Sequence, residues 1–327
     1  MYTFDNDVLE TAYAYVLSRG FPYYEFSLDE KKKELEKIKK YDLSKIIQGD
    51  IIRQTMHGLG LAWSYFPHAW SVKTRNMKTP MEVFQDKDLL KKAIDRRLKR
   101  GGFPMLKLNG SMTDSQIRKA LRSYSGVQSV SNFRPSAAAG IYQKYAGDGI
   151  VWDMSCGFGG RFLGALASGV VKFYYGTDPC TETFNGLVQM QEDFQYKGMY
   201  SLIQKRGSED KFLFSQEVDL CFTSPPYFNT EKYSDEVTQS YMAYDSPQSW
   251  NENFLRKTIQ NCYSCLKSTG YMVINIANVV THKTLEDDTV RIAKEEGFEL
   301  TETLKLQLSS IIKGGFKYEP VFVFKKI

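Results

Sequence analysis

The stretch with the most distinctive chemistry is Ser224-Pro225-Pro226-Tyr227, which directly follows an apolar run that begins at Asp219. Two consecutive prolines end a strand and carry no N–H donors, while their carbonyl oxygens remain free to accept hydrogen bonds. The Ser224 hydroxyl and the Pro225 carbonyl could bind an amino group on a planar base that stacks on Tyr227. Acceptors aimed at that amine would raise the electron density on its nitrogen, so that it could attack a methyl donor directly.

A second cluster begins at Asp153 and contains Ser155, Gly157 and Gly159, between an apolar run and a predicted helix. Glycines let a backbone approach a ligand closely, and a helix N-terminus offers free N–H groups. Asp178 closes the next predicted strand, where an acid can bind both ribose hydroxyls of a nucleoside cofactor. The sequence therefore predicts a nucleoside-binding site between these two strand ends, with a tight turn that binds nothing as the alternative.

The cluster does not fit a dinucleotide site, because that fingerprint needs a third glycine where this chain has Phe162. The carboxylate of Asp153 would also repel a pyrophosphate, whereas it would attract a cationic cofactor. Glu209 or Asp210, which lie just before a further strand, could contact the adenine of that cofactor. Ordinary loop polarity explains these two acids equally well.

Taken together, these residues resemble the S-adenosylmethionine-dependent DNA amino-methyltransferases, whose catalytic motif is (Asp/Asn/Ser)-Pro-Pro-(Tyr/Phe/Trp). The Ser-Pro-Pro-Tyr form is most typical of N4-cytosine enzymes, and the Asp and Asn forms of N6-adenine enzymes. The resemblance covers roughly residues 132–327 and departs from the family at Met154–Cys156. It implies S-adenosylmethionine as the cofactor and Ser224–Tyr227 as the catalytic tetrapeptide. By the same resemblance the cofactor contacts include Asp153, Gly157, Gly159, Asp178 and the upstream Phe133.

Positive charge is concentrated in the first part of the chain. Residues 1–140 hold 24 basic and 15 acidic side chains, whereas residues 141–327 hold 19 and 23. Such asymmetry indicates that the first part meets a polyanion, here DNA, although a solvated face explains any single basic residue equally well. The candidate substrate contacts are Arg96, Arg97, Arg100, Arg118 and, in the loop after the catalytic motif, Tyr233.

Helical patterns dominate the first part of the chain, with a single helix predicted over Met81–Arg100 and a second that begins at Thr113 with a capping box. From residue 149 onward, apolar strands alternate with helices, which predicts a mostly parallel sheet. Glu299–Leu308 and Pro320–Phe324 have no helix between them and predict an antiparallel hairpin. The expected α/β fold is a Rossmann-like methyltransferase sheet at 131–327, with a mainly helical, basic, DNA-binding and target-recognition domain at 1–130.

Other classes of protein are disfavoured. The chain has five cysteines, an odd number, and the Cys262–Cys265 pair lacks the partners of a zinc site. Cys180 follows a proline, as the nucleophile of 5-methylcytosine enzymes does, but it stands far from the catalytic loop position. No apolar run approaches the ~20 residues of a membrane span. We expect no metal, no membrane segment and a cytoplasmic location.

The sequence therefore predicts a site-specific DNA methyltransferase that acts on a flipped base, with cytosine N4 preferred over adenine N6. Methylation of RNA is an alternative, as is methylation of a protein glutamine, although the basic N-terminal part disfavours a protein substrate. A degenerate, DNA-binding relative is disfavoured by the intact Asp178 and Ser224–Tyr227. A cognate restriction nuclease is compatible with this function, and the sequence sets no oligomeric state.

Overall fold

The chain forms two compact units, each assembled from separate segments of the sequence. The computed structural model describes residues 6–101, 112–124, 126–195, 198–211, 214, 216–310 and 315–327. One unit, here called the helical unit, consists of Met1–Glu25, Pro67–Ser131 and Glu231–Tyr233. The other, called the sheet unit, consists of Phe26–Phe66, Asn132–Thr230 and Ser234–Ile327.

The helical unit packs its helices around a small apolar core that includes Val16, Ile94 and Leu121. Lys73–Thr74 and Glu231–Lys232 add a two-stranded antiparallel ribbon. Its elements are α1 (Asn6–Arg19), η2 (Pro67–Ser71), β3 (Lys73–Thr74), α4 (Pro80–Gln85), α5 (Lys87–Gly101), α6 (Asp114–Ser123) and β8 (Glu231–Lys232).

The single helix predicted over Met81–Arg100 is in fact two helices, α4 and α5. The chain leaves the helical conformation at Asp86, which has a φ of −92° and a ψ of 116°. The carboxylate of Asp86 then accepts hydrogen bonds from the backbone N–H groups of Asp88 and Leu89, both at 3.0 Å. An aspartate that caps the next helix therefore ends the first one. The capping box predicted at Thr113 is confirmed at the start of α6.

The sheet unit contains the remaining helices and strands. Its helices are α2 (Leu28–Lys39), α3 (Leu59–Trp63), α7 (Pro135–Tyr145), α8 (Gly160–Ser168), α9 (Thr181–Asp193), α10 (Ser240–Ala243), α11 (Pro247–Trp250), α12 (Arg256–Cys265) and α13 (Leu285–Glu295), with a 3₁₀ turn, η1 (Leu43–Lys45), and a π-helical turn, η4 (Asn251–Leu255). Its strands are β1 (Ile47–Gln48), β2 (Ile51–Ile52), β4 (Ile150–Asp153), β5 (Phe173–Thr177), β6 (Tyr200–Gln204), β7 (Val218–Thr223), β9 (Leu266–Asn275), β10 (Phe298–Ser310) and β11 (Phe316–Lys326).

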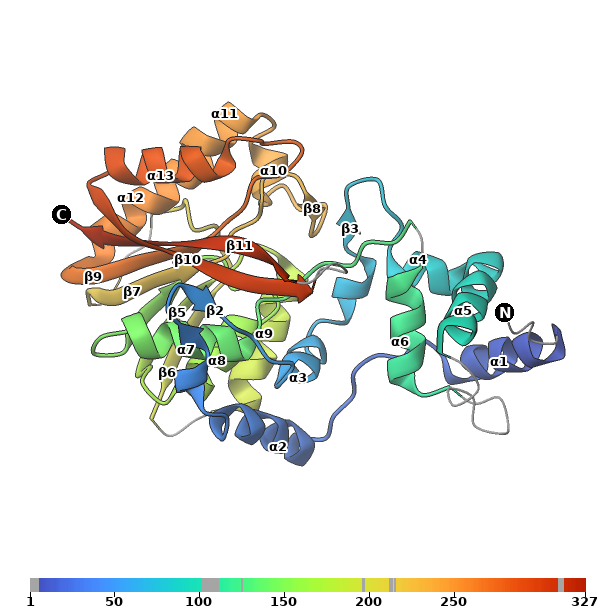
Figure 1. Ribbon diagram of the computed structural model, residues 1–327. Coiled ribbons are helices and arrows are strands. Elements are labelled where there is room, and N and C mark those ends of the chain that lie inside the picture. The colour runs from blue at the N-terminus through green and yellow to red at the C-terminus, as the bar shows by residue number, and fades with distance from the viewer. Residues whose placement is uncertain are drawn as a thin grey trace. The chain divides into compact units, whose positions relative to one another are not determined.

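These nine strands form one sheet in the order β1-β2-β10-β11-β9-β7-β4-β5-β6. Five neighbouring strands are parallel, in the order β9, β7, β4, β5 and β6. By contrast, β11 runs antiparallel to both β9 and β10. This arrangement confirms the predicted Rossmann-like sheet with a C-terminal antiparallel hairpin. All six residues of β7 are buried, as expected for a central strand covered on both faces. Helices α12 and α13 lie over one face, and α7 and α8 over the other (Figure 1).

The chain order reverses between β4 and β7, which are adjacent and parallel. From β4 the chain adds β5 and β6 on one side, and it then returns to add β7 and β9 on the other. In such sheets a ligand binds beyond the carboxyl ends of the strands at the point of reversal. Asp153 is the last residue of β4 and pairs with Phe222 of β7, so the glycine cluster and Ser224 emerge at the same edge.

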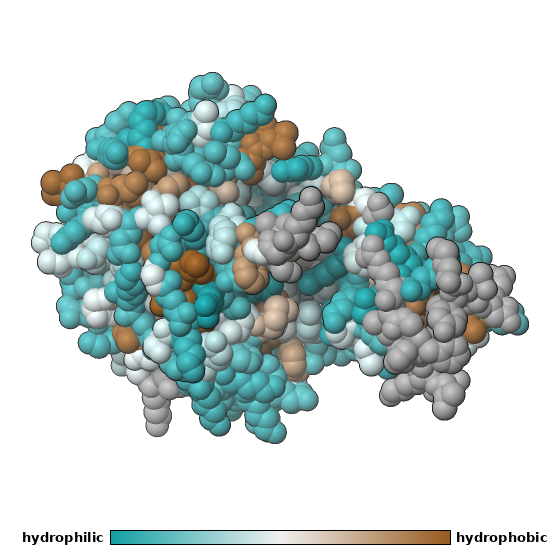
Figure 2. Space-filling view, in the orientation of Figure 1, coloured by the Kyte–Doolittle hydropathy of each residue, from teal (hydrophilic) through white to brown (hydrophobic). Residues whose placement is uncertain are grey.

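The compact units are not the two continuous stretches that the sequence predicts as domains. One division falls between Ser131 and Asn132, but Glu231–Tyr233 clusters with the helical unit and Phe26–Phe66 with the sheet unit. Its helix α2 buries Leu35 and Ile38 and contacts α8, while its many charged side chains give a hydrophilic surface (Figure 2). Within the described residues, no helix combines the length and the apolar character that a membrane crossing needs.

Candidate active site

The loop between β4 and α8 is built from residues with left-handed backbone conformations. Gly157 has a φ of +55°, and Gly159, which precedes the first turn of α8, has a φ of +69°. The φ of Gly159 favours glycine, and a Cβ there would lie 2.6 Å from Cε of Met190, which would have to move. A Cβ at Gly157 would meet only the carbonyl oxygen of Ser155, at 4.0 Å. The backbone at Gly157 is thus open to a ligand, as the sequence predicts.

Asp153, a predicted cofactor contact, has partners within the fold that the sequence does not indicate. Its side chain is fully buried, and both carboxylate oxygens accept hydrogen bonds from Nε of Arg161, at 2.9 and 3.0 Å. The hydroxyl of Tyr174 donates a third bond, at 2.6 Å. Burial opposes the charge on Arg161, but Asp153 holds the pKa of this guanidinium above its ordinary value. Arg161 therefore balances the charge of Asp153 within the fold.

Arg161 also donates a hydrogen bond to the carbonyl oxygen of Ser155, within the glycine loop. The buried ion pair therefore connects the end of β4, the loop and the first turn of α8. None of the sequence motifs described above contains Arg161. The available signal is that this arginine is the only charged residue in Gly160–Ser168, an otherwise small and apolar helix.

Asp178 follows β5 and lies against the glycine loop, where the sequence places it. Its carboxylate accepts hydrogen bonds from the backbone N–H of Gly157 at 2.9 Å and of Cys180 at 3.1 Å. Burial raises the pKa of Asp178 to about 6, although these two bonds oppose the shift. An ionised carboxylate can accept further hydrogen bonds in addition to these two. Asp178 can therefore bind ribose hydroxyls while it supports the loop.

Three further candidate cofactor contacts are Phe133, Glu209 and Asp210. Asn132 donates a hydrogen bond to the carbonyl oxygen of Phe158 at 2.8 Å, and this holds the Phe133 segment beside the loop. The ring of Phe133 packs edge-on against Phe222 of β7, with centroids 5.4 Å apart. Burial raises the pKa of Glu209 to about 7. Within the described parts of the chain, its buried Oε2 has no hydrogen-bond partner, whereas Asp210 is exposed.

The Ser224–Tyr227 motif begins immediately after β7, as predicted. Phe228, the next residue, has a φ of +54°, which is uncommon for a residue with an aromatic side chain and is typical of functional loops. Three side-chain oxygens next to the motif are buried without a hydrogen-bond partner among the described residues: those of Thr223, Asn229 and Thr230. Unpaired buried polar atoms are rare in folded proteins, so their concentration here marks a site for a polar ligand.

The loop after the motif is divided between the units. Tyr233 belongs to the helical unit, where its hydroxyl donates to Glu231. Glu236 belongs to the sheet unit and accepts hydrogen bonds from the backbone N–H and the hydroxyl of Thr181, at 2.8 and 2.7 Å. Thr181 is the first residue of α9, three positions after Asp178. The loop is therefore tied to the edge of the sheet that carries the cofactor residues.

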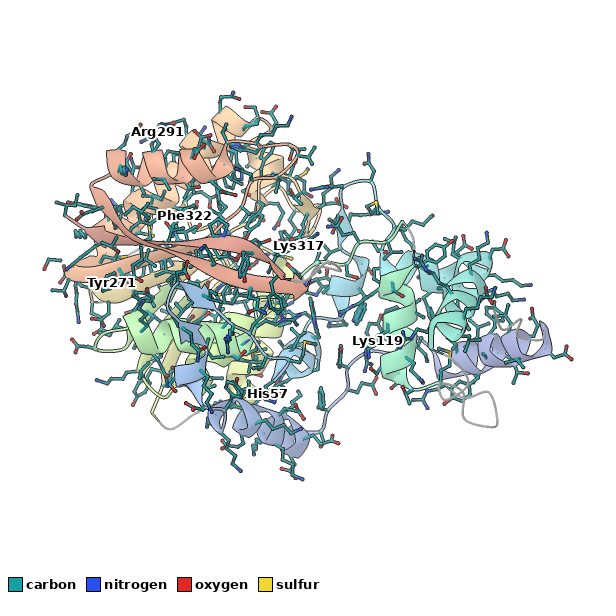
Figure 3. The ribbon with its side chains drawn as sticks, viewed as in Figure 1. His57, Lys119, Tyr271, Arg291, Lys317 and Phe322 are labelled. Carbon is teal, nitrogen blue, oxygen red and sulfur yellow. The ribbon has the colours of Figure 1, made fainter. Side chains whose placement is uncertain are left out.

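The predicted substrate contacts of the helical unit have different surroundings. Arg96 and Arg97 are half-buried on α5, and the side chain of Arg100 lies outside the described residues. The guanidinium of Arg118 donates to the carbonyl oxygens of Pro22 and Tyr23, at 2.9 and 3.3 Å. Its intramolecular partners make Arg118 a structural residue of this unit. Lys119, the next residue of α6, is exposed (Figure 3).

Residues 218–327 match the family model of N6/N4 DNA methylases, described as "DNA methylase". No curated protein matches the chain. Among the solved structures that resemble it is a methyltransferase from Pyrococcus furiosus, with 12% identity, a TM-score of 0.43 and a match over 63% of this chain and 91% of that one. An rRNA methylase from Streptococcus thermophilus has 13% identity and a TM-score of 0.39, over 61% of this chain and 99% of that one. A TehB-like SAM-dependent methyltransferase from Corynebacterium glutamicum has 15% identity and a TM-score of 0.39, over 60% of this chain and 89% of that one.

These three likenesses are too distant to specify a substrate, and the family match is the informative one. The matched range contains Ser224–Tyr227 and the strands from β7 to the C-terminal hairpin. The C-terminal third of this chain is thus similar to the amino-methyltransferases of the N4/N6 type.

Proposed function

We propose that this protein is a DNA methyltransferase that transfers a methyl group from S-adenosylmethionine to the exocyclic amine of a flipped base, preferentially N4 of cytosine. The observation that carries this proposal is the Ser224–Tyr227 motif, which follows β7 at the point of strand reversal and lies within the DNA methylase match. Glycines, an acid after β5 and an acid after β6 surround the same edge of the sheet.

The residues present fit S-adenosylmethionine. Gly157 leaves open space beside the loop, Asp178 can accept from the ribose hydroxyls, and the unpaired Oε2 of Glu209 can accept from the adenine amino group. Phe133 offers an apolar surface close to the loop. When bound, S-adenosylmethionine supplies a methyl group on a positively charged sulfur, which an amine can attack without a covalent intermediate on the protein.

The protein's own part in the transfer is to bind and orient the amine. The Ser224 hydroxyl and the Pro225 carbonyl accept hydrogen bonds from its two N–H groups, which turns the nitrogen lone pair toward the methyl group. As the N–C bond forms, the S–C bond of the donor breaks, and the amine then releases one of these protons. Tyr227 stacks on the base and fixes its plane. An amine inside a duplex is out of reach, so the base must leave the helix before it can enter this site. A restriction nuclease with the same sequence specificity would be the functional counterpart of such an enzyme.

The experiment that tests this function is the identification of the methylated nucleoside. The purified protein is incubated with labelled S-adenosylmethionine and unmethylated DNA, and the DNA is digested to nucleosides. 4-Methylcytosine is the expected product, and 6-methyladenine would instead assign the second base. Parallel reactions with RNA and with the protein alone provide the comparison. Transfer to RNA, with none to any DNA, would overturn the proposal.

The affinity for S-adenosylmethionine is expected to fall as the pH falls from about 7.5 to 5. The raised pKa values of Glu209, about 7, and Asp178, about 6, mean that both acids take up protons in this range. Because each must be ionised to accept most strongly from the cofactor, protonation weakens binding. Calorimetric titration at several pH values measures this dependence.

The variants separate the two acids. Glu209→Gln is expected to remove the decrease near pH 7, and Asp178→Asn the decrease near pH 6. The stability of the unliganded protein depends on pH in the opposite sense to the affinity. A raised folded-state pKa at Asp178 means that its contribution to the free energy of unfolding is lost as the pH rises from about 4 to 6. An affinity that is constant with pH would contradict both contacts.

Neutralising Arg96 and Arg97 together, with glutamine at both positions, is expected to reduce the salt dependence of DNA binding. Each lost phosphate contact changes the slope of log K against log salt by about 1. The matched control replaces Lys32 and Lys33, which are exposed on α2 of the sheet unit, by glutamine. Fluorescence anisotropy with labelled duplex at several salt concentrations gives the slopes. Equal slopes for the two double variants would place the DNA contacts elsewhere.

A further inference from the structure

The hydroxyl of Tyr227 lies among three oxygen atoms from two other segments of the sheet unit. It is 3.3 Å from the carbonyl oxygen of Asn275, 3.3 Å from its side-chain Oδ1 and 3.3 Å from Oε2 of Glu319. Asn275 is the last residue of β9, and Glu319 lies within β11. The far end of the tyrosine ring is therefore held by two strands of the sheet.

These two strands are themselves fixed relative to each other. Asn275 pairs with Val321 in the antiparallel ladder between β9 and β11. Its side-chain amide donates a hydrogen bond to the carbonyl oxygen of Pro320, at 2.9 Å. Asn275 is 2% exposed, so this amide is shielded from solvent. The ladder and the amide bond together place Glu319 beside the end of β9.

Glu319 is a half-buried acid on β11 whose pKa is subject to opposing influences. Burial raises its pKa, whereas hydrogen bonds with Tyr227 and Asn275 lower it. Glu286, on α13, is the other charged group that acts on it and raises the pKa further. A half-buried carboxylate is costly unless donors satisfy it, and the Tyr227 hydroxyl is such a donor. A hydroxyl that donates to a carboxylate forms a stronger bond than one that donates to a neutral oxygen.

The other end of Tyr227 is also constrained. The chain enters it through Pro225 and Pro226, each with a fixed φ, and leaves it through Phe228, which is 3% exposed and held at a φ of +54°. The ring thus has restrained backbone on one side and a hydroxyl bound to the sheet on the other. A ring held at both ends loses little conformational freedom when a planar group stacks on it.

We infer that Glu319 is a positioning residue that acts through the hydroxyl of Tyr227 and holds the ring ready for the flipped base. The inference rests on the proposed function and adds to it a reason for tyrosine at this position. A phenylalanine would provide the same stacking surface, but it could not be fixed by β11. The group recognised is a planar heterocycle that carries an exocyclic amine.

A double-mutant cycle tests this inference, with the methyl acceptor at varied concentration and the cofactor saturating. Glu319→Ala and Tyr227→Phe are each expected to lower kcat/KM for DNA by about 10-fold, because each removes the contact between the hydroxyl and the Glu319 side chain. The double variant is expected to lose no more than either single variant, since the second change removes nothing further. Glu319→Gln keeps an acceptor at the same place and is expected to restore most of the activity.

Controls separate positioning from a loss of folding. Glu299, an exposed glutamate on β10, is replaced by glutamine as the matched control and should behave as the unaltered protein. The melting temperature and the Kd for S-adenosylmethionine are measured for every variant, and neither should change for Glu319→Gln or Tyr227→Phe. These two variants keep the test decisive if Glu319→Ala does not fold.

Two results would overturn the inference. Losses that multiply in the double variant would show that Glu319 does not act through Tyr227, as would a Tyr227→Phe variant with full activity. Both presuppose that the unaltered protein methylates DNA, so they leave the proposed function intact. An unaltered protein that binds S-adenosylmethionine but transfers methyl to no DNA would instead overturn the proposed function, and this inference with it.

Discussion

Replacing Ser224 with alanine is expected to lower kcat by about 100-fold or more, with little change in the Kd for S-adenosylmethionine. The Ser224 hydroxyl is one of two acceptors that the motif offers to the amine, and the loss of one positioned polar contact to a reacting group typically costs about 10²–10³ in rate. Single-turnover transfer of the labelled methyl group measures the chemical step, and calorimetry measures cofactor binding.

The matched control is Ser264→Ala, which removes an exposed hydroxyl from α12 in the same unit. Its kcat should equal that of the unaltered protein. Loss of cofactor binding in Ser224→Ala, rather than loss of turnover, would show that this serine belongs to the cofactor pocket. Full activity of Ser224→Ala would remove the hydroxyl from the reaction and leave the Pro225 carbonyl as the acceptor.

Replacing Arg161 with methionine is expected to be the most destabilising single change proposed for this protein. It leaves the fully buried Asp153 without its cation and removes the bond from Arg161 to the Ser155 carbonyl. Removing one partner of a buried ion pair costs about 3–5 kcal/mol in the free energy of unfolding. Urea denaturation followed by circular dichroism measures the loss in the transition that reports the sheet unit.

The double variant Asp153→Leu/Arg161→Met provides the comparison. Because it removes both charges, it should recover much of the stability that Arg161→Met loses. Its affinity for S-adenosylmethionine should nevertheless remain low, because the glycine loop has lost its internal attachment. A loss below about 1 kcal/mol in Arg161→Met would contradict the role of the ion pair, since surface pairs contribute that much.

The main strands of the sheet unit could be predicted, though not their order in the sheet, because each of them carries a local signal. β4, β7 and β9 are apolar runs that are covered on both faces, and the hairpin β10–β11 has no helix between its strands. The strands β1 and β2 could not be predicted, because two residues show no periodicity. They join the sheet through contacts distant in sequence, such as the hydrogen bond from Lys305 N–H to the Asp50 carbonyl oxygen.

For the candidate site, the sequence indicated which residue types stand at the strand ends but not what surrounds each of them. The type and place of Asp153 suggested a charge available to the cofactor. The sequence does not show that Arg161 pairs with this charge, since only folding brings the two side chains together. Glu319 is 92 residues from Tyr227 in the chain, and only the register of β9 and β11 brings them together. Contacts of this kind depend on tertiary packing, which local patterns do not encode.

The division of both units into separate segments limits how this protein can be engineered or recombined. A fragment that begins at Asn132 would lack Phe26–Phe66 and hence α2 and α3 of the sheet unit. A fragment that ends at Ser131 would lack β8, the partner strand of β3. No single cut in the polypeptide therefore yields either unit whole. A change of target specificity by exchange of an intact module would require several coordinated junctions, one of which lies three residues after Tyr227.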